Sequence, residues 1–211
     1  MEPLLKFNDC CRYLEQRFKE PLPGEKAQLK LSPPYRGSIM PKALNDYRTG
    51  AVMLVITDLD GKPGIVFIER ADDGKVHSGQ IAFPGGKADP TDSSLLHTAL
   101  RETEEEIGVK LTEVTPVGEL TQLYIPPSNF MVNPFVGFTK GAPAYKISDG
   151  EVKRIVEIPL THFFDKDVLT TMTVTTSRGV AEVPCYSLLG VQIWGATSMI
   201  LSEFLNLFSE T

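Results

Sequence analysis

One stretch of this chain, residues 85–109, constrains the fold more than any other part of the sequence. It opens with a pair of glycines, continues through a polar segment, and then runs from Ser94 to Ile107 without an internal glycine or proline. Gly108 stands where a helix commonly ends in a left-handed conformation. The stretch therefore predicts a loop, a helix and a second loop, with Asp92 or Ser93 as the N-cap of the helix.

The predicted helix carries three glutamates on one face. Glu102, Glu105 and Glu106 are three and four positions apart, so they are neighbours on a helix, whereas Glu104 falls on nearly the opposite side. Carboxylates held close together repel one another unless a cation lies among them. Mg²⁺ and Mn²⁺ prefer such oxygen ligands and also bind phosphate oxygens. The spacing is typical of metal-assisted attack of water on a phosphoric anhydride, with a solvated acidic face as the simpler alternative.

The residues around the three glutamates favour a metal site over a solvated acidic face. Phe83-Pro84-Gly85-Gly86 precedes the helix, and Arg101 stands directly before Glu102. Together they resemble the Nudix box, whose pattern is Gly, five residues, Glu, seven residues, then Arg-Glu-aliphatic-any-Glu-Glu-any-Gly-aliphatic. This resemblance implies a hydrolase in which the three glutamates bind Mg²⁺ or Mn²⁺ and Arg101 orients their carboxylates.

The sequence departs from the Nudix box at three points. Ser93 stands where the box has its first Glu, the segment after Gly86 is one residue longer, and Thr103 occupies an aliphatic position. We expect Asp92 or Asp89 to fix the start of the helix in place of the missing Glu.

The rest of the chain predicts an α/β protein. Buried-strand runs lie on both sides of a turn at Asp60-Gly61, at residues 51–57 and 65–70. We expect further strands at residues 114–124, 131–139 and 152–158, a hairpin over 170–188 and a helix over 198–208 capped by Thr197. Such elements indicate an α/β/α sandwich on a mixed β-sheet with a loop-helix-loop catalytic motif, and the resemblance implies the same architecture.

The N-terminal part differs from this pattern. An amphipathic helix is predicted to end before Pro21, and a proline-rich segment over 21–34 would wrap around the surface. We therefore divide the 211 residues into an arm at 1–36 and a Nudix hydrolase domain at 37–211. Dimerisation through residues 1–36 is left open.

The composition indicates which partners and which cellular compartment are expected for this chain. A net charge of −6 and a pI near 5.2 argue against binding to nucleic acid or an anionic membrane. Nowhere do about 18 apolar residues run together. Cys10 and Cys11 are adjacent and Cys185 stands alone, so we expect no disulfide framework. With charges throughout the first 20 residues in place of a signal peptide, these features favour the cytoplasm.

A second motif narrows the substrate. Arg70-Ala71, then Lys75, Gly79 and Phe83-Pro84-Gly85-Gly86 at intervals of three residues, resemble the signature of the coenzyme A pyrophosphatase branch of the Nudix family. That signature ordinarily has Leu-Leu-Thr where Phe67-Ile68-Glu69 stand here, and Arg at the position of Lys75.

The resemblance assigns substrate-binding roles to residues of this loop. Arg70, Lys75 and His77 would offer cations to the diphosphate and to the additional 3′-phosphate of coenzyme A. The alternative for Arg70 is an ion pair with Glu69 or Asp72. The flexible backbone of Gly85-Gly86 would let the chain approach the diphosphate.

A further carboxylate outside the box often acts in this family as base or extra ligand. Glu151, at the start of the strand predicted over 152–158, is our candidate, with Glu119 and Glu157 as alternatives. An ordinary solvated turn residue is the other interpretation of Glu151.

These observations predict a metal-dependent diphosphatase that cleaves coenzyme A or acyl-coenzyme A to 3′-phospho-AMP and (acyl-)4′-phosphopantetheine. One alternative is a Nudix hydrolase of another nucleoside diphosphate compound or of an oxidised nucleoside triphosphate. The other is a non-catalytic nucleotide-binding module with an acidic face that is only structural.

Overall fold

The hairpin predicted at Asp60-Gly61 forms the centre of the main sheet in the computed structural model, which describes residues 6–34, 36, 47–72, 74, 78–139, 141–176 and 179–209. Strand β1 (Arg48–Leu59) pairs antiparallel with β2 (Lys62–Arg70) and parallel with β7 (Phe130–Thr139). The sheet is therefore mixed, as predicted.

Five further strands extend this sheet. Its order is β3-β2-β1-β7-β5, while β4 pairs with β1, β6 with β7 and β8 with β2. The bounds are Ile81–Ala82 for β3, Gly85–Lys87 for β4, Val114–Glu119 for β5, Leu123–Ile125 for β6 and Val152–Pro159 for β8. A separate sheet, in the order β11-β10-β9, contains β9 (Leu169–Thr176), β10 (Gly179–Leu188) and β11 (Val191–Trp194).

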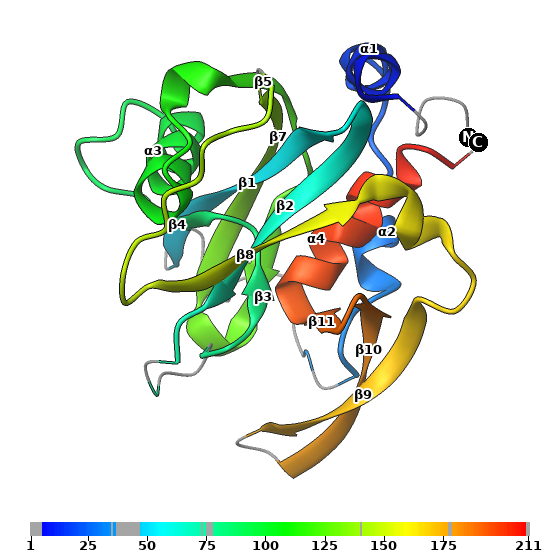
Figure 1. Ribbon diagram of the computed structural model, residues 1–211. Coiled ribbons are helices and arrows are strands. Elements are labelled where there is room, and N and C mark those ends of the chain that lie inside the picture. The colour runs from blue at the N-terminus through cyan, green and yellow to red at the C-terminus, as the bar shows by residue number, and fades with distance from the viewer. Residues whose placement is uncertain are drawn as a thin grey trace.

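Helices cover both faces of the main sheet (Figure 1). Successive side chains of a strand point to opposite faces, and β1 follows this rule. Met53 packs with Ala99 of α3 (Leu95–Ile107), whereas Leu54 packs in the cluster that holds Phe204 of α4 (Gly195–Asn206). The predicted α/β/α sandwich is confirmed.

The N-terminal segment contains two helices rather than one. The amphipathic helix is present as α1 (Phe7–Arg17), with Cys10 and Leu14 buried on the α4 side of the sheet. The segment expected only to wrap the surface holds α2 (Gly24–Leu29). Six residues are too few for a helix to be stable alone. Buried Glu203 of α4 accepts hydrogen bonds from Gln28 Nε2 at 2.7 Å and Gly24 N at 3.2 Å, and so holds α2 in place.

The bounds of several other strands and helices also differ from the predictions. The single strand expected over residues 114–124 is interrupted between β5 and β6. Pro134 lies in the central strand β7 opposite this interruption, where its carbonyl accepts a hydrogen bond from Leu120 N at 2.8 Å. Helix α4 begins at Gly195 after Trp194, so Thr197 is not its cap, and β11 was not predicted. Within the described residues, no helix is both long and apolar enough to span a bilayer.

Candidate functional site

Helix α3 carries the acidic residues of the candidate site, and both of its ends are fixed. Ser94 is the N-cap and accepts a hydrogen bond from His97 N at 3.1 Å, so the prediction of Asp92 or Ser93 as the cap was wrong. The helix ends at Gly108, whose φ of 76° is left-handed as predicted. The carboxylates on its last two turns therefore project from a rigid element.

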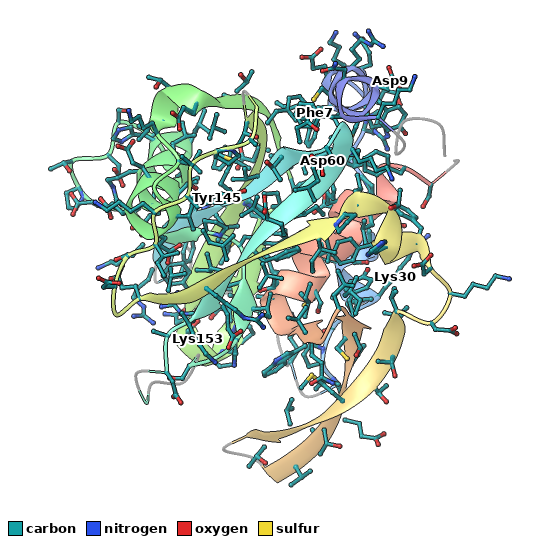
Figure 2. All side chains as sticks on the ribbon, in the orientation of Figure 1. Phe7, Asp9, Lys30, Asp60, Tyr145 and Lys153 are labelled. Carbon is teal, nitrogen blue, oxygen red and sulfur yellow. The ribbon has the colours of Figure 1, made fainter. Side chains whose placement is uncertain are left out.

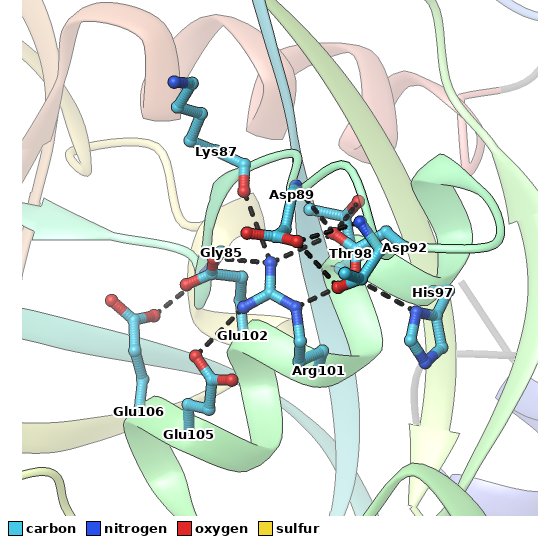
Figure 3. A network of polar contacts seen from close by, with 12 residues as sticks. Gly85, Lys87, Asp89, Asp92, His97, Thr98, Arg101, Glu102, Glu105 and Glu106 are labelled. Atoms are coloured by element: carbon cyan, nitrogen blue, oxygen red, sulfur yellow. Dashed lines mark hydrogen bonds and ion pairs between the residues drawn. The ribbon is translucent and has the colours of Figure 1, made fainter.

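Asp92 binds Arg101 instead of capping the helix. Its carboxylate accepts from Arg101 Nε at 2.9 Å and Nη2 at 3.1 Å, and also from Thr98 Oγ1 at 2.8 Å (Figure 3). The Asp92 side chain is only 3% exposed, and the hydrogen bonds from Arg101 hold its pKa well below the ordinary range. Asp92 thus fixes the start of the helix, where the Nudix box has Glu and this chain has Ser93.

Arg101 connects Asp92 to two glutamates of the box. Its Nη2 lies 2.9 Å from Glu102 Oε1, and its Nη1 lies 3.0 Å from Glu105 Oε2. Glu102 remains mostly buried, whereas the Glu105 side chain is 55% exposed. The guanidinium therefore touches carboxylates on both sides, as expected for a residue that orients them.

The two glycines bring backbone against the acids. They were predicted to lie in a loop, but they belong to strand β4, which pairs antiparallel with β1. Gly85 N donates to Glu106 Oε2 at 2.8 Å, and a Cβ on Gly86 would lie 2.4 Å from Glu102 Oε2. Gly85 also has a φ of 152°, which other residues rarely adopt. Only glycines permit this close approach.

Burial and mutual repulsion make these carboxyl groups unusual. Glu106 is 4% exposed, and burial raises its pKa to about 7, with the charges of Glu102 and Glu151 acting in the same direction. Burial also raises the pKa of Glu102, and Glu105 and Glu151 add to that effect. Glu102, Glu106 and Glu151 therefore interact electrostatically, although Glu151 lies on a different element.

Glu151 reaches this site through the pairing of β2 with β8. Its carbonyl accepts from Ala71 N at 2.9 Å, and its Oε2 accepts from Ser148 Oγ at 3.2 Å. The alternative Glu157 is bonded to the Tyr145 hydroxyl at 2.7 Å. The other alternative, Glu119, ends β5. Of the three, Glu151 is the carboxylate whose charge acts on both Glu102 and Glu106.

Arg70 faces the acidic site. Its Nη1 lies 3.7 Å from Glu106 Oε1, and its side chain is 39% exposed. Glu69, considered as an alternative partner, is instead bound by Lys153 and Arg154. Lys75 and His77, also assigned to substrate binding, lie outside the described residues.

A cavity of about 420 Å³ borders the carboxylates. Lys87, Asp89, Arg101, Glu102 and Glu105 contribute to its lining. Strand β4 and the loop before α3 therefore form one wall of a space beside the acidic residues, large enough for part of a small molecule.

Comparison with known proteins agrees with this geometry. The model of the NUDIX domain matches residues 47–167, more than half of the chain. The chain belongs to the Nudix domain family. Its class of activity is hydrolysis of a diphosphate bond.

Curated relatives and a solved structure extend the comparison. An uncharacterized Nudix hydrolase NudL of Photorhabdus laumondii is 32% identical over 83% of this chain and 90% of its own length. The NudL of Yersinia enterocolitica is 43% identical over 47% of this chain and 50% of its own length. In fold, the chain resembles a MutT/nudix family protein from Enterococcus faecalis, with a TM-score of 0.52 and 16% identity over 93% of this chain and 72% of that one.

The chemistry of the Nudix carboxylates fits a divalent cation, which members of this family use. Within the described residues, no three acids, histidines or cysteines are gathered closely enough to coordinate an ion. Glu105 is turned toward Arg101, but Glu102 and Glu106 are buried acids whose charges repel each other and Glu151. A divalent cation would relieve that repulsion and provide the counter-charge that Arg101 and Arg70 supply only in part.

Proposed function

We propose that this Nudix hydrolase cleaves coenzyme A or acyl-coenzyme A to 3′-phospho-AMP and (acyl-)4′-phosphopantetheine, with Mg²⁺ or Mn²⁺ as cofactor. The observation that carries the proposal is that buried Glu106 and mostly buried Glu102 lie against strand β4, with Arg70 Nη1 3.7 Å from Glu106 Oε1. Acids that would bind a metal and a cation that would bind an oxyanion lie close together here, which supports the proposal.

The glutamates of α3 would hold the metal. Buried Glu106 and mostly buried Glu102 would be ligands, and Glu105 would join them if its contact with Arg101 opened. A bound Mg²⁺ or Mn²⁺ polarises the phosphoryl oxygens and lowers the pKa of a bound water. Arg101 is proposed to keep the carboxylates oriented through its bonds to Asp92 rather than to bind the substrate.

Glu151 is proposed to take the proton of the attacking water. It comes from a strand start and not from the metal-binding helix, and its charge acts on both buried glutamates. A carboxylate beside a metal-bound water is a suitable general base.

Arg70 supports the assignment of the substrate. It opens the motif that resembles the coenzyme A pyrophosphatase signature, and it is the cation next to Glu106. It would bind the diphosphate, and Lys75 and His77 of the same motif would add to this positive charge. The Gly85-Gly86 backbone is proposed to approach the same diphosphate.

Product identification tests the proposal. The protein is incubated with Mg²⁺ and, separately, with coenzyme A, acetyl-coenzyme A, ADP-ribose, a dinucleoside polyphosphate and an oxidised nucleoside triphosphate, and products are read by mass spectrometry. We expect 3′-phospho-AMP and phosphopantetheine from coenzyme A. If only another compound of this set is cleaved, the protein is a diphosphatase but coenzyme A is not its substrate.

A further inference from the structure

A buried acid, Glu69, lies one residue before Arg70 in the sequence and holds two exposed cations. The Glu69 side chain is 11% exposed, and its two carboxylate oxygens lie 2.6 Å from Lys153 Nζ and 2.5 Å from Arg154 Nε. The two cationic side chains are 59% and 55% exposed. Lys153 is the second residue of strand β8 and is labelled in Figure 2. One buried carboxylate therefore fixes two cations at the surface.

An irregularity in the pairing of β2 with β8 makes this arrangement. Glu69 pairs with Arg154 but Arg70 pairs with Val152, so the register shifts by one residue between them. In a regular strand, neighbouring side chains such as those of Lys153 and Arg154 point to opposite faces. The bulge removes this restriction and lets both reach the same carboxylate.

The cluster of Glu69, Lys153 and Arg154 carries a net positive charge. One carboxylate against two cations leaves an excess of one positive charge, next to Arg70 in sequence and on the strand that begins after Glu151. The bond to Glu69 uses Nε of Arg154, and within the described residues its terminal amino groups make no other hydrogen bond. An ordinary exposed ion pair would need only one cation and would contribute little stability.

We propose that Lys153 and Arg154 form a subsite for a phosphomonoester dianion, which in the substrate is the 3′-phosphate. Arg offers paired N–H donors that match two phosphate oxygens, and Lys adds a compact point charge. Glu69 holds both side chains in position before the ligand arrives. The inference rests on the proposed function, because it assigns to these residues a part of the same substrate.

Binding of a product without a diphosphate bond tests the subsite independently of catalysis. The dissociation constants of 3′-phospho-AMP, AMP and inorganic phosphate are measured by calorimetry with Mg²⁺ present. The wild-type protein should bind 3′-phospho-AMP roughly 10-fold or more tightly than AMP, as a charge-assisted contact predicts. Phosphate alone should bind more weakly than 3′-phospho-AMP, because free phosphate lacks the nucleoside.

The variant must remove the cations without leaving a buried charge unpaired. Glu69→Gln/Lys153→Gln/Arg154→Gln is therefore used, and its fold is checked by circular dichroism. It should bind AMP as the wild type does and lose the preference for 3′-phospho-AMP. Lys62→Gln, at the exposed opposite end of β2, is the matched control and should keep the preference.

The outcomes separate this inference from the proposed function. A wild type that does not prefer 3′-phospho-AMP, or a folded triple variant that keeps the wild-type preference, overturns the subsite. If the preference is present and the triple variant loses it, the subsite stands even when coenzyme A is not cleaved. Cleavage of coenzyme A and of its 3′-dephospho form with equal kcat/KM would contradict the subsite and leave the diphosphatase intact.

Discussion

Asp92 accepts two hydrogen bonds from Arg101, from Nε at 2.9 Å and from Nη2 at 3.1 Å, and so joins the loop before α3 to the acids on its last turns. Arg101 also contacts Glu102 and Glu105 and donates to the Lys87 carbonyl. The position of the carboxylates that we propose as metal ligands therefore depends on Asp92, an acid that belongs to neither the helix nor the proposed metal site.

Replacing Asp92 should weaken both activity and stability. Asp92→Asn removes one charge of the bidentate pair, so Arg101 is free to move and we expect kcat to fall roughly 10-fold or more. Urea unfolding should show a lower midpoint. Ser93→Ala is the matched control, because Ser93 is exposed and should have no effect on either quantity. An equal loss of kcat and of stability in both variants would mean that residue 93, and not Asp92 alone, fixes the start of the helix.

A methyl group on Gly86 should weaken binding at the proposed metal site without unfolding the protein. The added Cβ would lie 2.4 Å from Glu102 Oε2, closer than real contacts allow, so in Gly86→Ala the Glu102 carboxylate has to move. We expect Mn²⁺ affinity, measured by calorimetry, to fall roughly 10-fold while the far-ultraviolet circular dichroism is retained. Unchanged Mn²⁺ affinity would show that Glu102 is not a ligand.

The stability of the metal-free protein should fall as pH rises. Burial raises the pKa of Glu106 from near 4.5 to about 7, so the folded state keeps a proton that the unfolded chain releases. The contribution is fully present below pH 4.5, declines as pH rises, and is lost above about pH 7, a change of up to about 3 kcal/mol.

This pH effect is measured by urea unfolding in the presence of a chelator, as the difference between wild type and Glu106→Gln. The wild type should lose more stability than the variant between pH 5 and pH 7.5, because Gln does not ionise. Parallel curves for the two proteins would mean that Glu106 titrates near its ordinary value.

Glu151 should affect the rate more than the binding of metal. Its proposed role as base predicts that Glu151→Gln lowers kcat about 100-fold at pH 7, while Mn²⁺ affinity changes by less than about 3-fold. Activity should recover partly at high pH, where hydroxide replaces the base. Glu157→Gln, which retains a partner for Tyr145, is the control and should keep the wild-type rate. A large loss of Mn²⁺ affinity in Glu151→Gln would make it a ligand instead.

The sequence was sufficient where local patterns decide the structure. Helix α3 was predicted from its periodicity and from Gly108, and the β1–β2 hairpin from its apolar runs and turn residues. Helix α2 was missed because it is held by Glu203, 175 residues from Gln28. No local pattern reports such a partner.

The candidate site also combines features that local sequence patterns predict with features that depend on distant residues. The box glutamates share a helix face, so their spacing was enough to find them. The contact of Arg70 with Glu106, and of Glu69 with Lys153 and Arg154, depends on the register of β2 with its neighbours and on a bulge that the sequence does not reveal. The glycine pair was found, but its approach to Glu102 and Glu106 follows from the pairing of β4 with β1.

The central claim is that buried Glu106 holds the metal of a diphosphatase, and the turnover of Glu106→Gln with coenzyme A and Mg²⁺ tests it most directly. Gln keeps the size of the side chain and can accept the bond from Gly85 N, so the fold should be retained. We predict a fall in kcat of about 1,000-fold, while Glu104→Gln on the opposite face of α3 keeps the wild-type rate. Wild-type turnover by Glu106→Gln would contradict the account.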